Sequence, residues 1–131
     1  MEEALIAKLL DTSGVSAIVG TRVFPLSLPQ GSAKPAITVQ RVSGAPLYAD
    51  DGEVGLEAAR MQIDCWAETY SGAKLLSRAA RDCLSAFSGT HEGINFRYLM
   101  LDAERDLREG GSNADHYPFR TSLDFIVWYV N

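Results

Sequence analysis

The sequence has few of the features that mark a secreted, membrane-spanning or metal-stabilised protein. It contains only two cysteines, Cys65 and Cys83, and neither belongs to a Cys-x-x-Cys pair. Each is predicted to be a small buried residue with a free thiol, rather than part of a disulfide or a metal site. No apolar run approaches the ~20 residues of a membrane span. The acidic start lacks the basic and apolar regions of a signal peptide, so we expect a protein that is made and kept in a cytoplasm.

Basic residues are in the minority. Twelve lysines and arginines stand against seventeen acidic residues, which gives a formal net charge of −5. An acidic surface disfavours adhesion to phosphate backbones and to anionic membranes, and proteins that read DNA sequence are usually basic. We therefore expect neither sequence-specific DNA binding nor a membrane partner.

Motifs of the common catalytic sites are also absent. The chain has no Gly-x-Ser-x-Gly elbow, no P-loop, no Gly-x-Gly-x-x-Gly and no His-Glu-x-x-His. Its two histidines, His91 and His116, fall in segments predicted to be loops, where a histidine is usually solvated. The sequence therefore predicts a protein that is not an enzyme, with no catalytic residue, no cofactor and no metal ion.

Two acidic clusters were the remaining candidates for a chemical site. Asp50, Asp51 and Glu53 lack the alternating oxygen ligands of an EF-hand loop, so we interpret them as part of a solvated loop. A second acidic run lies between residues 102 and 109. Paired carboxylates of a glycosidase need a concave pocket, which this run does not indicate.

The residues that are present describe an ordinary globular protein. A length of 131 residues suits one domain, and 47% apolar with 22% charged residues is a usual composition. No internal repeat or low-complexity tail divides the chain. We predict a single domain over residues 1–131.

Helical periodicity predicts two main helices. The first covers the N-terminal residues up to Asp11, and one short helical turn at residues 15–19 follows it, closed by Gly20. The second should begin with Thr69 or Ser71 as N-cap and end at Phe87. Its apolar stripe is Leu76, Ala80, Cys83, Leu84 and Phe87.

Strand patterns separate and follow these helices. A brief strand is predicted at residues 22–24, and longer ones at 36–43, 57–67, 94–100 and 119–130. Alternation places Ala59, Met61, Ile63 and Cys65 on one face, and Ile94, Phe96, Tyr98 and Met100 on one face of their strand. Residues 25–35 and 44–55 are predicted to be long loops, and residues 109–113 a hairpin tip. The order predicts an α+β fold, a mostly antiparallel sheet with two helices packed on one face.

The two tryptophans lie near strand ends. For Trp66 two interpretations remain, half-buried core and an anchor at a protein interface, and core is favoured. The last strand places Phe119, Leu123, Phe125, Val127 and Tyr129 on one face, while its other face ends with Ile126, Trp128 and Val130. Because both helices are assigned to the first face, Trp128 and Val130 need another cover, which a further subunit would supply.

Several stretches together resemble one known family. They are residues 19–25, 28–31, 34–37, 60–67 leading into Tyr70, 102–106 and 117–125. In this succession they are similar to the tail completion proteins of long-tailed bacteriophages, which also occur in prophages and gene transfer agents. They cover nearly the whole chain.

The resemblance implies an α+β fold and a homo-oligomeric ring, typically of six copies, at the head-proximal end of a tail tube. Such a ring ends tube growth and joins the tail to the head, as a tail terminator or head-to-tail joining protein. The implied partners are other copies, the tail tube protein and a neck or head-completion protein, with DNA passing through the ring without specific binding. The implied location is the tail–head junction of the virion, after assembly in the host cytoplasm.

These expectations give a set of candidate interface residues. Leu47 and Tyr48 are apolar residues of the predicted loop 44–55, and we expect them to anchor in a neighbouring subunit or the tail tube. The full set is Leu47, Tyr48, Asp50, Asp51, Glu53, Trp128 and Val130. Two alternatives remain open: a small ligand-binding or enzymatic domain with a pocket under the 44–55 loop, and another neck or tube component.

Overall fold

The computed structural model describes residues 1–49, 52–108 and 118–130. Their elements, in chain order, are α1 (Glu2–Asp11), α2 (Ser13–Val19), β1 (Val23–Pro25), β2 (Ala36–Ala49), β3 (Gly52–Ala67), α3 (Tyr70–Leu84), β4 (Gly89–His91), β5 (Ile94–Arg108) and β6 (Phe119–Val130). The fold is α+β, as predicted. The expected hairpin tip at residues 109–113 lies outside the described residues.

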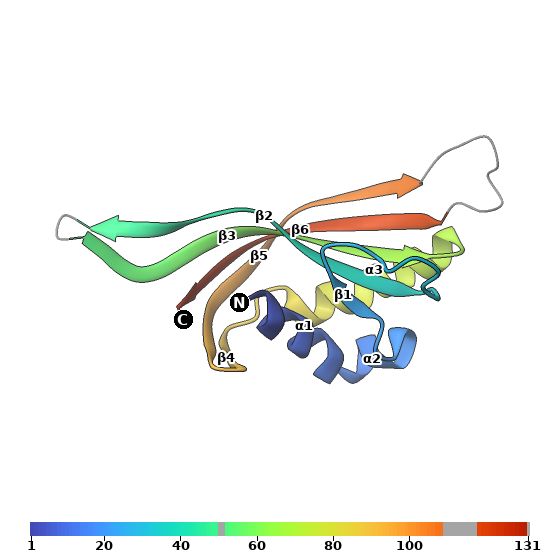
Figure 1. The fold of residues 1–131 in the computed structure, drawn as a ribbon, viewed down its shortest axis with the longest axis horizontal. Helices are drawn as coiled ribbons and strands as arrows, with labels where there is room; N and C mark the ends of the chain where they lie inside the picture. The colour runs from blue at the N-terminus through green and yellow to red at the C-terminus, as the bar shows by residue number, and fades with distance from the viewer. Residues whose placement is uncertain (50–51, 109–117, 131) are drawn as a thin grey trace.

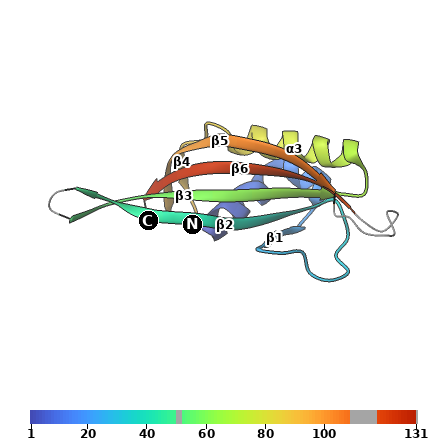
Figure 2. The same cartoon turned by 90° about the horizontal axis from the view of Figure 1, so that it is seen from above.

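The strands form one curled sheet with the helices on one side of it (Figure 1). The strand order is β1-β2-β3-β6-β5-β4. β1 runs parallel to β2, and every other neighbouring pair is antiparallel. Figure 2 looks onto the face opposite to the helices, which we call the open face. The predicted antiparallel sheet with helices on one face is therefore confirmed.

The core lies between the helices and the inner face of the sheet. β3 and β6 contribute alternate residues, as predicted, because successive side chains of a strand point to opposite faces. The buried residues of the central strands and helices include Leu5, Leu9, Val15, Val19, Met61, Ile63, Cys65, Leu76, Ala80, Leu84, Leu123, Phe125 and Val127. Full burial of such a side chain contributes roughly 1.5–3 kcal/mol.

The helix boundaries have local causes. Only Thr12 separates α1 from α2, and α2 ends at Gly20, whose φ of 62° suits a residue without a side chain. Thr69 caps α3, since its hydroxyl accepts a hydrogen bond from the Gly72 amide at 3.0 Å. The predicted end at Phe87 is wrong. The helix ends at Leu84, because Ala86 takes a φ of 62° and donates its N–H to Leu99 of β5.

The predicted face of β5 is wrong beyond Phe96. A register shift between Phe96 and Tyr98 moves the following residues by one position relative to β6, as a β-bulge does. Leu99 is therefore buried, and Tyr98 and Met100 lie on the open face. His91 lies in the short strand β4 and not in the predicted loop.

The predicted loop at residues 44–55 is also wrong. Residues 44–49 and 52–55 continue β2 and β3 as one antiparallel hairpin that ends with the pair Ala49 and Gly52. Pro46 is compatible with this strand because its outer side has no neighbouring strand in the described part of the chain; β1 pairs only with residues 37–39. A side chain on Gly44 would lie 2.5 Å from the Arg41 guanidinium, so glycine here allows a close approach.

Candidate protein-interaction site

The end of the β2–β3 hairpin projects beyond the helices and the rest of the sheet (Figure 1). β6 pairs with β3 only as far as Leu56, so residues 47–49 and 52–55 form a ribbon of two strands, which we call the arm. Leu47 and Tyr48 lie on the arm, and Tyr48 is 71% exposed. A two-stranded ribbon is at best marginally stable alone in water. The arm would therefore gain from contact with another surface.

Some of the acidic candidates cannot be placed with Leu47 and Tyr48. Asp50 and Asp51 lie outside the described residues, as does His116. Glu53 lies in β3 and pairs through its backbone with Tyr48. The alternative of a pocket under a 44–55 loop loses its premise, because the described residues of this segment are paired strands rather than a covering loop.

A polar cluster holds the base of the arm and was missed in the sequence. Arg41 lies at a register shift of β2; its Nε donates to Glu2 Oε1 at 2.6 Å, and its guanidinium also donates to the Tyr129 hydroxyl at 2.7 Å. The same hydroxyl donates to Glu57 Oε2 at 2.5 Å. These bonds connect α1, β2, β3 and β6 where the hairpin leaves the body. The bonded pairs are up to 88 positions apart in sequence, and no local pattern indicates that these residues meet.

The ionisation of this cluster fits its hydrogen bonds. Burial, and then the hydrogen bond to Glu57, raise the pKa of the Tyr129 hydroxyl, so the group remains a donor at neutral pH. Burial opposes ionisation of Glu2, but the hydrogen bond from Arg41 and the nearby positive charges lower the net pKa of that carboxyl. The Arg41–Glu2 contact is therefore an ion pair at neutral pH.

The open face carries an ionic network at its centre. Arg60 contacts Asp102 at 2.7 Å and Asp124 at 3.1 Å, and Arg105 contacts the second oxygen of Asp124 at 3.4 Å. Asp124 is only 5% exposed although none of the described helices covers this face. The arginine side chains therefore shield the carboxylate themselves, and this network links β3, β6 and β5.

Beside the network, the open face becomes apolar toward the arm. Tyr98 pairs with Trp128, and Met100 pairs with Ile126. We call Tyr98, Met100, Ile126, Trp128 and Val130 the apolar patch. Tyr98 is 46% and Met100 41% exposed, and the three β6 residues are half-buried. Sequence analysis identified Trp128 and Val130 but missed Tyr98 and Met100, because the bulge reverses the faces of β5.

Trp66 does not belong to the helix-covered core, contrary to its predicted place. It lies half-buried on the open face, at the opposite end of β3 from the arm. Its indole Nε1 donates to Thr38 Oγ1 at 3.0 Å, and the Arg120 guanidinium lies 5.0 Å from its ring centroid. Its polar edge is thus satisfied within the chain.

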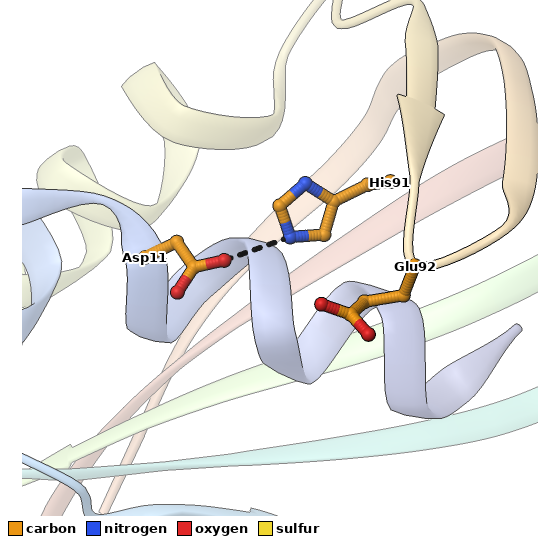
Figure 3. Close-up of side chains that lie close together, drawn as sticks. All are labelled: Asp11, His91 and Glu92. Carbon is orange, nitrogen blue, oxygen red and sulfur yellow. Dashed lines mark hydrogen bonds and ion pairs between the residues drawn. The ribbon is translucent and has the colours of Figure 1, made fainter.

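The remaining candidates concern thiols and metal ligands. Both cysteines are free, as predicted; Cys65 is buried, which raises its thiol pKa, whereas Cys83 is half-buried with its sulfur 3.1 Å from Thr12 Oγ1. His91 Nε2 lies 3.0 Å from Asp11 Oδ2, with Glu92 beside them (Figure 3).

None of the helices in the described ranges is long and apolar enough to cross a membrane.

Comparison with known proteins identifies the family. The family model for tail completion protein gp17 matches residues 3–130. The chain belongs to this family. Tail completion proteins of this family are structural and not enzymes, so the predicted absence of enzymatic activity and the resemblance found in the sequence are both confirmed. None of the curated proteins matches the chain significantly.

A solved structure supports the same fold for this tail completion protein. The similar chain comes from a virion of a native gene transfer agent particle. The TM-score is 0.81 at 18% sequence identity, and the match covers 100% of this chain and 95% of the other. At this identity the likeness shows the fold. The overall fold of this chain is therefore also found in a chain of that virion.

Proposed function

We propose that this tail completion protein forms a homo-oligomeric ring, of about six copies by resemblance to its family, at the head-proximal end of a phage-like tail tube. The ring ends tube growth and joins the tail to the head or neck. The observation that carries this proposal is the arm, a two-stranded projection with exposed Leu47 and Tyr48. An enzyme would have no evident use for it, whereas an assembly protein needs a surface that reaches a neighbour.

The arm and the apolar patch are the two surfaces that would meet. Val130 of the patch pairs with Leu56, where the arm begins, so the two surfaces are continuous along one side of the molecule. An arm that lies on the patch of the next copy makes a head-to-tail contact, and such contacts generate a ring when the rotation closes. Large apolar side chains such as Tyr48 and Trp128 suit the centre of an interface.

The charge of the chain suits the passage of DNA. With a net charge of −5 per copy, a ring repels phosphate backbones and lets DNA slide through without binding. The partners proposed beyond other copies are the tail tube protein on one side and a neck or head-completion protein on the other. The corresponding location is the tail–head junction of a virion.

Negative-stain microscopy of the purified protein mixed with tail tubes tests the proposal. The wild-type protein should cap one end of each tube, and a variant in which residues 47–55 are replaced by Asn-Gly, a dipeptide that favours tight hairpins, should not. Leu26→Ser is the matched control, because Leu26 is an exposed apolar residue outside the arm.

Particle yield provides the second measurement. The shortened variant should melt like the wild type and fail to give infectious or DNA-transferring particles, while Leu26→Ser retains both. Normal particle yield with the shortened arm would refute the proposal. Binding along the whole tube, instead of at one end, would favour the alternative of a tube component.

A further inference from the structure

Asp11, His91 and Glu92 bring three potential metal ligands together on the side of the molecule away from the open face. Asp11 is the last residue of α1, His91 is the last of β4, and Glu92 begins the turn into β5. One ligand atom from each lies within 4.8 Å of the other two. Figure 3 shows the imidazole between the two carboxylates, with its Nε2 directed at Asp11.

The spacing of these atoms suits a small transition-metal ion. Metal–ligand bonds to histidine nitrogen and carboxylate oxygen are about 2.0–2.2 Å, which places two ligands of a tetrahedral ion roughly 3.3 Å apart. The Asp11 Oδ2 to His91 Nε2 distance is 3.0 Å. The Glu92 ligand atom lies within 4.8 Å of the other two, and its side chain is exposed, so a rotation about its side-chain bonds brings it closer without displacing buried neighbours.

The donor set selects the class of ion. One imidazole nitrogen with two carboxylate oxygens suits zinc and neighbouring divalent ions, whereas calcium and magnesium prefer oxygen ligands alone. The metal-binding form of the site has a neutral imidazole and two carboxylates. Its local charge of −2 attracts a divalent cation.

We propose that Asp11, His91 and Glu92 bind one divalent transition-metal ion of the zinc type. The remaining coordination positions are open to water, because Asp11 and Glu92 are exposed. The bound ion ties the end of α1 to the β4–β5 turn, two elements that the chain separates by 80 positions. This role is independent of the arm and of ring formation, and it goes against the sequence prediction of no metal.

Isothermal titration of the chelator-treated full-length protein with zinc chloride tests the site. We expect one ion per chain for the wild type. His91→Gln should abolish binding, and Asp11→Asn and Glu92→Gln should each weaken it by at least about tenfold, since even outer-shell changes cost 10- to 100-fold. Asp82→Asn and Glu68→Gln are matched controls, because they remove exposed carboxylates elsewhere. Cys83→Ser is a third control. It removes a thiol that contacts Thr12, the residue after Asp11.

Melting curves separate metal binding from folding. Zinc should raise the melting temperature of the wild type and the controls, because an ion that binds only the folded state stabilises it. It should leave His91→Gln unchanged, although that variant melts normally without metal. If His91→Gln fails to fold, Asp11→Asn and Glu92→Gln decide the question. Unchanged zinc affinity in these variants, or no binding by the wild type, would overturn the proposal.

Discussion

The hairpin of β2 and β3 passes through two environments. Over the body of the molecule its inner face packs against the helices, and β3 has a strand on each side. In the arm the same two strands continue, and no other strand or helix of the described residues lies beside or beneath them (Figure 1). The body has the contacts that stabilise a fold, while the arm has exposed side chains that have no cover within the described chain. This difference separates residues needed for folding from residues available for assembly.

The largest expected loss of stability follows a substitution in the buried core of the body. Phe125 is fully buried and pairs with Met61 and Leu101 on either side. Phe125→Ala should lower the free energy of unfolding by about 3–5 kcal/mol, because the lost burial leaves a cavity. Urea denaturation measures this loss. A change below about 1 kcal/mol would show that the inner face is not the centre of stability.

The junction between body and arm should give an intermediate effect. Arg41→Met removes the donor to Glu2 and to Tyr129, and leaves the Glu2 carboxylate and the Tyr129 hydroxyl with one partner fewer each, while the bond from Tyr129 to Glu57 stays. We expect a loss of about 1.5–3 kcal/mol, the usual contribution of hydrogen bonds that involve a charged group. Arg97→Met, which replaces an exposed arginine on β5, is the control and should melt as the wild type does. Equal melting of both variants would show that the junction is not held by Arg41.

The same junction predicts a pH dependence. The pKa of Glu2 is lower in the folded protein than its ordinary value, because of its bond with Arg41 and nearby positive charge acting against burial. Its contribution to stability is therefore present above the unfolded pKa and is lost as the pH falls through the folded pKa. Melting of Glu2→Gln and wild type should differ at pH 7 and converge below about pH 4. A difference that persists in acid would contradict this assignment.

The smallest expected effect on stability lies in the arm itself. Tyr48→Ser changes an exposed side chain, so it should alter the free energy of unfolding by less than about 0.5 kcal/mol. Its effect should instead be seen as loss of tube capping by microscopy. Trp128→Ser sharpens the comparison, because Trp128 is half-buried and should lose a little stability along with assembly. Normal capping by both variants would remove the arm and patch from the interface.

Sequence alone predicts the body well and the arm poorly. Met61, Ile63 and Cys65 alternate with polar residues because one face of β3 is buried. Their spacing in the sequence therefore predicts that they face the core. In the arm the residues whose burial is described are exposed, and the hydrophobic alternation that marks a strand is missing. Gly44 and Pro46 therefore suggest a loop in the sequence. In the structure Gly44 allows the close approach of Arg41, and Pro46 lies on an edge strand.

The candidate surfaces show the same limit. Trp128 was found because β6 is regular, whereas Tyr98 and Met100 were missed because one extra residue in β5 reverses the faces that follow it. A bulge leaves no mark on composition. The Arg41 cluster and the Asp11–His91 contact depend on the tertiary fold, since their members come from different ends of the chain.

The outer edge of β2 beyond Val39 affects the tendency of the protein to aggregate. In the described chain β1 covers only residues 37–39 of this edge, so the rest presents unpaired backbone groups, the kind of template from which strands of other chains nucleate fibres. Pro46 has no N–H to offer and interrupts that template. The charged Arg41 and the kink at its register shift disturb it a second time. The hairpin that we propose reaches a partner is thus less open to indiscriminate pairing with strands of other chains.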